Sequence, residues 1–256
     1  MRFALLGSGS EGNALVVQAG RTAVLLDCGF SLAETGARLA RLGLDAGQIS
    51  GIVVTHEHAD HIGGVARLAR QHAIPVWLTH GTLRAHLHML GDLPCVTGID
   101  PHSSFAIGDL QVQPYIVPHD ATEPVQYVFG DGAAKLGVLT DAGCATPHIE
   151  AMLHGCHALV LECNHDTAML ANGDYPYFLK QRVGGRLGHL SNDDAARLLA
   201  RLDNSRLQHI VAAHLSQKNN LPELAVTALS RALGCAEDWI AVASQQEGLG
   251  WRDVVA

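Results

Sequence analysis

Residues 53–64 read VVTHEHADHIGG, and three histidines and one aspartate fall within six positions directly after an apolar run. Imidazole and carboxylate groups at the end of a strand gain little from packing, but they bind divalent metal ions well. In an extended segment, side chains two residues apart point the same way, so His56 and His58 can contact one ion. Asp60 and His61 follow where the chain turns toward a helix, and they can face a second ion.

A metal ion bound by nitrogen and oxygen atoms needs about four ligands, so further ligands must come from elsewhere in the chain. Polar residues end apolar runs at three later points: His119 in YIVPHD, Asp141 in LGVLTDAG and His214 in HIVAAHLSQ. Strand ends at one edge of a sheet core can converge on one cleft. The pattern therefore predicts one metal centre that combines these residues with the 53–64 segment.

The size and composition of the chain are those of a globular protein. It has 256 residues, of which 48% are apolar and 16% charged, and we expect a single domain over residues 1–256. No apolar run reaches the ~18 residues that a membrane span needs. Gly and Ser break the apolar start of the chain after Leu6, so we expect a cytoplasmic protein that makes no contact with a membrane.

Cysteine spacing and charge exclude several kinds of protein. The six cysteines include no CxxC pair, which argues against a zinc ribbon or a thioredoxin-like centre. The formal net charge of −8 argues against a broad surface for nucleic acid. A polyanion would therefore have to bind locally, with bound cations and a few arginines offsetting the repulsion.

Short apolar runs alternate with helical patterns along the chain. We expect strands at residues 2–6, 14–18, 22–27, 51–54, 75–78, 110–117, 125–129, 134–139, 158–162 and 209–213. We expect helices at residues 32–42, 62–71, 82–90, 192–202 and 221–233, with Ser191 and Pro222 as start signals for the last two. This layout occurs twice, with a break near residue 120, and indicates helices outside a core of two sheets. Residues 163–188 are expected to form a long irregular segment, which in compact domains is often functional.

The order HxHxDH, followed by a distant His, Asp and His, resembles the metallo-β-lactamase fold superfamily. The resemblance covers nearly the whole chain, and Asp27 in LLDCGFS matches an early strand-end aspartate that is usually structural. It implies an α/β fold, a four-layer αββα sandwich of two mixed β-sheets flanked by helices, with a two-metal site at the sheet edges. It also implies the ligands: one ion is bound by His56, His58 and His119, the second by Asp60, His61 and His214, and Asp141 bridges both.

The implied cofactors are two divalent transition-metal ions. Without a cysteine among the ligands, the ligand set does not select one metal: Zn²⁺ is usual in His-rich sites, and Mn²⁺ or Fe²⁺ also suits a carboxylate-bridged pair. Two ions ~3.5–4 Å apart lower the pKa of a shared water and stabilise charge on attacking and leaving oxygens. Such a centre indicates a hydrolase, in which Asp60 is both a ligand and a catalytic residue that orients the attacking water.

The superfamily fold alone does not choose the substrate. A strand-end Glu in LVLECNHD, then GHLSN, then AHLSQKNN, is similar to the phosphodiesterase branch that includes ribonuclease Z. In that branch an additional histidine lies by the leaving group; here it is His189, and Glu162 would orient it. With GSGSEGNA at 7–14 and YPYFLKQRV at 175–183, the motifs resemble the YycJ/WalJ-like subgroup, described as phosphodiesterases or DNA exonucleases.

The resemblance implies a nuclease, with nucleic acid as its partner and DNA favoured over RNA. In this chemistry His189 can give a proton to the departing oxygen. Cations and aromatic rings in the irregular segment suit one or two phosphates and a stacked base, although a solvated loop with an aromatic anchor is an equal alternative. The candidates for substrate contact are Lys180, Arg182 and Arg186 in that segment, and Ser10 and Asn13 in the early glycine-rich turn, which also fits a tight turn that lines the cleft.

Two other functions fit parts of the pattern. A thioester or other small-molecule hydrolase of this fold uses the same metal ligands, but glyoxalase II carries a C-terminal helical domain for which this chain has no room. A non-catalytic regulatory protein that binds metal needs the ligands, but it needs neither His189 nor Glu162. The sequence does not indicate the physiological substrate or the oligomeric state.

Overall fold

Alternating apolar residues in the first part of the chain form a mixed sheet of seven strands in the computed structural model, which describes residues 1–90, 93 and 95–256. The strand order is β14-β1-β2-β3-β4-β5-β6. The strands are β1 (Arg2–Gly7), β2 (Ala14–Ala19), β3 (Thr22–Leu26), β4 (Gly51–Val53), β5 (Val76–Thr79), β6 (Val96–Ile99) and β14 (Leu249–Asp253).

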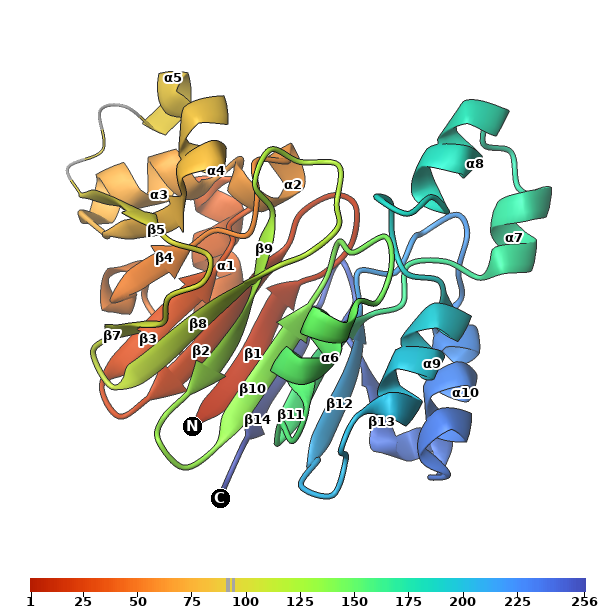
Figure 1. The fold of residues 1–256 in the computed structure, drawn as a ribbon. Coiled ribbons are helices and arrows are strands. Elements are labelled where there is room, and N and C mark those ends of the chain that lie inside the picture. Colours follow the sequence, from red (N-terminus) through yellow and green to blue (C-terminus); the bar gives the residue numbers. More distant parts are fainter. Residues whose placement is uncertain (91–92, 94) are drawn as a thin grey trace.

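A second sheet of seven strands packs against the first (Figure 1), in the order β13-β12-β11-β10-β9-β8-β7. Its strands are β7 (Phe105–Ile107), β8 (Leu110–Ile116), β9 (Val125–Gly130), β10 (Lys135–Leu139), β11 (Ala158–Glu162), β12 (His209–Ala213) and β13 (Ile240–Val242). Each sheet begins as an antiparallel meander and continues with parallel strands, from β3 to β6 in the first and from β10 to β13 in the second.

This repeated layout confirms the expectation of two similar halves, but the predicted break near residue 120 is wrong. The second sheet already begins with β7, so the change from one half to the other falls between residues 99 and 105. The sequence hides this point because β7 has only three residues and is too short to show a clear periodicity.

Helices cover the outer faces of both sheets. Beside the first sheet lie α1 (Leu32–Arg41), α2 (Ala59–Ile62), α3 (Val65–His72), α4 (His80–Ala85) and α5 (Leu87–Leu90), and beside the second lie α6 (Pro147–Leu153), α9 (Asn192–Arg201) and α10 (Pro222–Leu233). Ser191 caps α9 by accepting a hydrogen bond from the Asp194 backbone N–H (3.1 Å), and Pro222 opens α10. Both predicted start signals are confirmed.

Three clusters of buried apolar side chains correspond to the interfaces of a four-layer αββα sandwich, which confirms the expected fold class. One lies between the sheets and includes Val24 and Val211. A second joins the first sheet to its helices, for example Leu25 to Leu68, and the third does the same for the second sheet, for example with Leu198. Burial on both faces explains why the central strands are almost continuously apolar.

The structure corrects several element predictions. The expected helix at 62–71 starts earlier and is divided into α2 and α3 around Gly63–Gly64, and the expected helix at 82–90 is divided at His86. The 163–188 segment is not irregular throughout, because it contains α7 (Thr167–Asn172) and α8 (Tyr177–Val183). Sequence reasoning also missed α6 and the strands β6, β7, β13 and β14. The strands β7 and β13 have only three residues each, and β6 and β14 carry polar and glycine residues.

The ends of the chain and the α7–α8 segment lie at opposite ends of the molecule in Figure 1. Both termini are at the lower end, whereas α7 and α8 project at the upper right. The HEHADH residues run from the loop after β4 into α2, which contains Asp60 and His61, at the upper end. Among the described residues, no helix has the length and apolar character that crossing a bilayer requires.

Candidate metal centre

The predicted ligands outside the HEHADH segment each follow a strand of the second sheet. His119 lies after β8, Asp141 after β10 and His214 directly after β12. Asp141 and His214 have positive backbone φ angles of 53° and 54°, and Asp27 after β3 has a φ of 59°. This left-handed conformation bends the chain sharply at the strand end, and Asp and His tolerate it better than β-branched residues do.

The HEHADH segment is fixed against the loop after β3 by backbone contacts. The Cys28 N–H donates to the carbonyl oxygen of His61 (2.7 Å), and the Gly64 N–H donates to the carbonyl oxygen of Cys28 (2.7 Å). A Cβ atom on Gly64 would collide with the carbonyl oxygen of Phe30, so a glycine is required where the two loops cross. The histidines are thereby held at the sheet edge.

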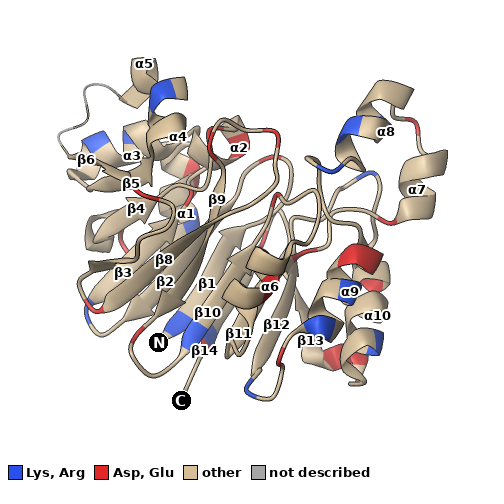
Figure 2. Cartoon of the chain, viewed as in Figure 1, with Lys and Arg blue, Asp and Glu red and all other residues tan. Residues whose placement is uncertain are grey.

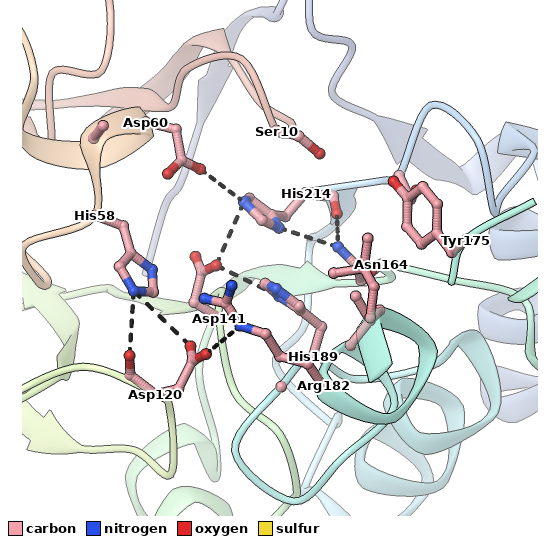
Figure 3. Close-up of a pocket in the computed structure, with 15 residues that line it drawn as sticks. Ser10, His58, Asp60, Asp120, Asp141, Asn164, Tyr175, Arg182, His189 and His214 are labelled. Atoms are coloured by element: carbon pink, nitrogen blue, oxygen red, sulfur yellow. Dashed lines mark hydrogen bonds and ion pairs between the residues drawn. The ribbon is translucent and has the colours of Figure 1, made fainter. Parts of the chain in front are cut away.

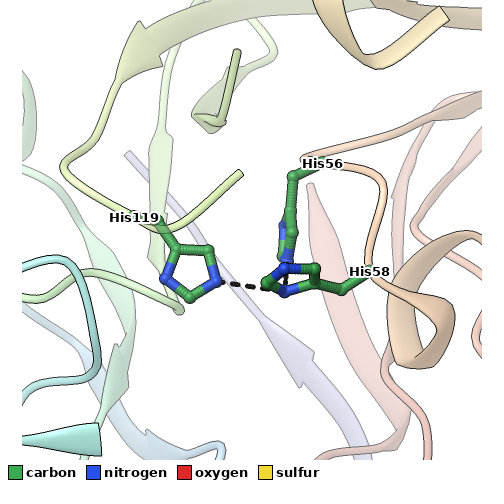
Figure 4. Close-up of side chains that lie close together, drawn as sticks. All are labelled: His56, His58 and His119. Carbon is green, nitrogen blue, oxygen red and sulfur yellow. Dashed lines mark hydrogen bonds between the residues drawn. The ribbon is translucent and has the colours of Figure 1, made fainter. Parts of the chain in front are cut away.

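Three of the histidines form a first ligand group (Figure 4). His56 Nε2 lies 3.0 Å from His58 Nδ1, and His119 Nε2 lies 3.3 Å from the same atom. The residues come from the loop after β4 and the loop after β8, so both sheets contribute to the group. Its ligand atoms all lie within 4.8 Å of one another, which suits a single ion.

A second ligand group consists of Asp60, His61 and His214. Asp60 Oδ2 lies 3.4 Å from His61 Nε2 and 3.7 Å from His214 Nε2. Asp141 lies between the two groups: its carboxylate is 3.2 Å from His61 Nε2, 3.5 Å from His214 Nε2 and 3.9 Å from His119 Nε2. The structure thus brings together all seven residues that the sequence predicts as ligands.

The protonation of the histidines fits metal binding. His61 Nδ1 lies 2.8 Å from Asp27 Oδ2, His58 Nε2 lies 3.2 Å from the Asp120 carbonyl oxygen, and His119 Nδ1 lies 3.1 Å from the Gly188 carbonyl oxygen. These oxygens can only accept, so each of these ring nitrogens carries a proton, and the other nitrogen, which faces the centre, is the one left to bind a metal ion.

Asp27 also acts on His56, through Thr55. The Thr55 hydroxyl donates to Asp27 Oδ2 (2.8 Å), so it accepts from His56 Nδ1 at 2.9 Å. The Asp27 carboxylate therefore orients His56 and His61 at once, which gives the early aspartate the structural role that the resemblance implies. Sequence reasoning missed Thr55, whose signal is its position directly before HEHADH.

Two atoms of the centre are buried without a hydrogen bond. Within the described residues, Asp141 Oδ2 and His214 Nε2 have no hydrogen-bond partner, although each lies near other ligand atoms. An unsatisfied buried carboxylate oxygen is costly, and a divalent cation removes that cost. The residues present therefore fit the metal ions that the donor set indicates.

The groups of the centre shift the pKa values of one another. Burial lowers the pKa of His61, but Asp141 and Asp27 outweigh it and raise that pKa well above its usual value. Burial likewise lowers the pKa of His214, but neighbouring carboxylates, Asp141 first, raise it to about 10. The buried carboxylates thus attract positive charge, which a bound cation supplies in place of protons.

Glu162 holds several parts of the site in place through contacts with both of its carboxylate oxygens. Its Oε1 accepts a hydrogen bond from His189 Nδ1 (2.8 Å) and lies 3.4 Å from His214 Nδ1. Its Oε2 accepts from the backbone N–H groups of Ala142 and Leu190, each at 3.0 Å. Burial by itself raises the pKa of Glu162, but His189 and the hydrogen bonds have the larger effect and lower that pKa to about 2. The predicted pairing of Glu162 with His189 is present.

A pocket of about 370 Å³ opens onto the centre (Figure 3). His58, Asp60, Asp141 and His214 line it, and His189 lies beside them. The α7–α8 segment supplies further lining residues, namely Tyr175, Leu179, Arg182 and Val183. The centre is therefore accessible to a ligand of moderate size.

Two of the five residues predicted to contact the substrate line the pocket, and three do not. Ser10 and Arg182 line the pocket, whereas Asn13, Lys180 and Arg186 do not. Asn13 is buried, and its Nδ2 lies 3.2 Å from Asp60 Oδ2, so it contacts a ligand residue and is not exposed to substrate. The Lys180 ammonium donates to the carbonyl oxygen of Ala171 (2.7 Å), which ties α8 back to α7.

Sequence reasoning missed other residues at the pocket, above all Asp120. Its Oδ2 accepts a hydrogen bond from Arg182 Nε (2.6 Å), which connects the α8 helix to the loop of His119. The available signal was its place directly after that histidine in YIVPHD. Asn164 and Ser216 also line the pocket, and they lie in the NHD and HLSQ motifs.

Residues 22–210 match the family described as "Beta-lactamase superfamily domain". The chain belongs to this beta-lactamase superfamily. Two relatives that match over most of their length carry nuclease names. The chain is 38% identical over 239 residues to exodeoxyribonuclease YycJ of Bacillus anthracis, covering 91% of this chain and 89% of that protein. It is 32% identical over 229 residues to exodeoxyribonuclease WalJ of Streptococcus pneumoniae, covering 88% and 85%.

A solved structure with the superfamily fold supports the architecture. The metallo-beta-lactamase fold protein YhfI from Bacillus subtilis aligns with a TM-score of 0.77, covering 98% of this chain and 99% of that one. The sequence identity is only 15%, so this likeness bears on the fold and not on the activity.

Proposed function

We propose that this chain is a metal-dependent hydrolase of phosphodiester bonds, and specifically a DNA exonuclease. The two relatives that match over most of their length are named exodeoxyribonucleases. The observation that carries the proposal is the His189–Glu162 pair beside the two ligand groups. A protein that only stores or senses metal needs the ligands but has no use for an oriented histidine at the pocket wall.

Two divalent ions would be held by the two ligand groups, with Asp141 between them. We propose Zn²⁺, with Mn²⁺ or Fe²⁺ as alternatives, because the donor set is imidazole and carboxylate without thiolate. When bound, such ions act as Lewis acids that lower the pKa of a water and neutralise charge on a phosphoryl group. We also propose that residues 1–256 act as one domain, because both sheets supply ligands to the same centre.

The protein groups around the centre suit phosphodiester cleavage. Burial lowers the pKa of His189, but the Glu162 carboxylate outweighs burial and raises that pKa above its usual value, which favours the imidazolium. With Nδ1 donating to Glu162, the Nε2–H of this imidazolium can give its proton to the departing oxygen. Asp60, on the opposite side of the centre, has a carboxylate that can accept a hydrogen bond from the attacking water. Arg182 uses Nε for Asp120, so its other guanidinium N–H groups are available to a phosphate.

DNA is the proposed substrate, although the net charge of −8 disfavours binding of nucleic acid over a wide surface. Only a short stretch near the metal ions would contact the protein, which suits an enzyme that acts at a strand end. A thioester is the competing substrate class, because the same ligands serve hydrolases of both kinds.

A single comparison of substrates tests the proposal. Protein loaded with Zn²⁺ or Mn²⁺ is mixed with bis(p-nitrophenyl) phosphate, a thioester, end-labelled DNA and end-labelled RNA. We expect cleavage of the phosphodiester and stepwise shortening of the DNA from one end. Hydrolysis of the thioester with both nucleic acids left intact would contradict the proposal. Faster shortening of RNA than of DNA would reject the choice of DNA.

A further inference from the structure

One wall of the pocket carries an aromatic ring that the activity proposed above does not use. Tyr175 lines the pocket and is half-buried, between α7 and α8. Figure 3 places it on the far side of the pocket from His58, with Arg182 also reaching into the space. A ring at this position offers a flat apolar surface within reach of a ligand held at the metal centre.

A lysine from a different segment lies over this ring. Lys218 Nζ is 5.7 Å from the centroid of the Tyr175 ring, and Lys218 belongs to the loop between β12 and α10. Within residues 1–90, 93 and 95–256, Lys218 forms no ion pair with a carboxylate. Lys218 is exposed and does not itself line the pocket, so a solvent-accessible ammonium group lies over a ring that does.

The position of Lys218 is notable because the chain has only three lysines. Lys180 donates to the Ala171 carbonyl oxygen, and Lys135 lies at the start of β10. Figure 2 shows further positive charge on α8, where Lys180 and Arg182 lie. Of these cations, Arg182 lines the pocket and Lys218 lies over Tyr175. The two positive charges favour a negatively charged ligand at this wall, while the lining carboxylates Asp60 and Asp141 belong to the metal centre and Asp120 pairs with Arg182.

We propose that Tyr175 and Lys218 form a nucleotide subsite, in which the ring stacks on one base and the ammonium contacts the adjacent phosphate. This inference rests on the proposed function and names the part of the substrate that the pocket recognises. Tyr175 and His189 line the same pocket. A base stacked on Tyr175 therefore lies in the pocket into which the proposed proton donor also faces.

Stacking needs only the face of an aromatic ring, so this subsite favours a substrate with bases over a small phosphodiester, whatever the sequence of the bases.

Tyr177 offers a matched control for Tyr175. It lies two residues away in the same segment, but its side chain is 78% exposed and it does not line the pocket. Lys135 is the corresponding control for Lys218, because it is exposed and lies on a distant strand.

The experiment measures binding, so that it does not depend on catalysis. Metal-loaded protein is titrated into a fluorescent oligothymidylate of about ten residues with phosphorothioate linkages, which are cleaved slowly, and into the same strand with every base removed. Tyr175→Ala is expected to weaken binding of the oligothymidylate about tenfold, and binding of the abasic strand less than about twofold. Tyr175→Phe and Tyr177→Ala should bind both strands like the wild type.

The lysine is tested through salt dependence. Lys218→Met should reduce the slope of log affinity against log salt by about 0.7, as expected for the loss of one phosphate contact on a single strand, whereas Lys135→Met should leave the slope unchanged. Equal weakening of both strands by Tyr175→Ala, an equal effect of Tyr177→Ala, or an unchanged slope for Lys218→Met would overturn the subsite.

These outcomes are separate from failure of the proposed function. If the wild type cleaves DNA but Tyr175→Ala binds like the wild type, only the subsite is rejected. If base-dependent binding through Tyr175 is found but no phosphodiester is cleaved with either metal, only the proposed activity is rejected.

Discussion

At the scale of single residues, His189 depends on one carboxylate for its orientation. Glu162 is fully buried and holds His189 Nδ1 at 2.8 Å, while its other oxygen binds two backbone N–H groups. The imidazole is thus fixed without being one of the predicted ligands. Its role can be separated from metal binding by substitution.

His189→Ala should slow phosphodiester cleavage by roughly 10²–10⁴, because the departing oxygen loses its proton donor. The metal content should remain that of the wild type, since both ligand groups are intact. Turnover numbers and elemental analysis of the same preparation check this. His148→Ala, an exposed histidine on α6, serves as the control and should behave as wild type. Unchanged turnover in His189→Ala would refute the general-acid role.

Asp141 is the residue on which both ligand groups depend, because its carboxylate lies near members of each. We expect purified wild-type protein to hold close to two transition-metal ions, and Asp141→Ala to lose most of both. Elemental analysis after dialysis gives the stoichiometry. Asp193→Ala, on the exposed face of α9, should retain both ions. A variant at Asp141 that loses only one equivalent would show that it does not bridge.

At the scale of helices and strands, residues with a left-handed backbone fall into two kinds: those that the metal centre requires, and one that only lowers the stability of the protein. Among the described residues, four that are not glycine have positive φ angles, and three of them follow strands at the metal centre: Asp27, Asp141 and His214. Such conformations cost of order 1–3 kcal/mol each and persist where the site requires them. The fourth, Ala73, ends α3 and has no such reason.

Ala73→Gly should stabilise the protein by about 1 kcal/mol, because glycine adopts the left-handed C-cap without strain. Ala73 is exposed, so no packing is lost. Gly234→Ala is the reverse test at the end of α10: its φ is 66° and a Cβ would meet no atom within 4 Å, so strain alone should destabilise it by a similar amount. Urea unfolding measures both changes, and the same sign for both would contradict the explanation.

At the scale of the whole molecule, the two apolar clusters between the sheets and their helices protect three of the six cysteines. Cys28, Cys156 and Cys163 are buried, whereas Cys95 is exposed and Cys144 and Cys235 are half-buried. Burial raises the pKa of Cys28 and of Cys156 to about 11, and that of Cys163 further. The three buried thiols have little reactive thiolate at neutral pH.

Titration with a thiol reagent should therefore show fast reaction of Cys95, slower reaction of the two half-buried cysteines, and no reaction of the other three until the protein unfolds. The reaction rate of the three buried cysteines should follow global unfolding of the protein, because all three lie in the cores between a sheet and its helices. Ellman's reagent, with and without denaturant, gives the number of reactive thiols in the unfolded and in the native protein. Reaction of all six thiols in the native protein would show that the cores open locally.

The success of the sequence predictions differs from segment to segment for physical reasons. Strands buried on both faces, such as β11 and β12, were predicted at their observed bounds, because a short apolar run that ends at polar residues is typical of a strand inside a sheet. The edge strands β6 and β14 were missed, since a strand that is partly exposed need not be apolar, and the edge strand β7 was missed because it has only three residues. The helices α7 and α8 were missed because each is short and bounded by Gly, Asp and Pro.

The sequence by itself determined the seven ligand candidates and the strands that carry them, because imidazoles and carboxylates at the ends of apolar strands are costly unless they serve a site. The division of these ligands between two ions and the pairing of Glu162 with His189 came from the resemblance of the motifs to the superfamily and its phosphodiesterase branch. Only the tertiary structure decided which other residues face the pocket. Asn13 is buried against Asp60 and does not line the pocket, whereas Asp120 and Tyr175 do, and Lys218 lies over the Tyr175 ring. Their segments carry no periodic signal, and their place depends on how loops from two sheets meet at one edge.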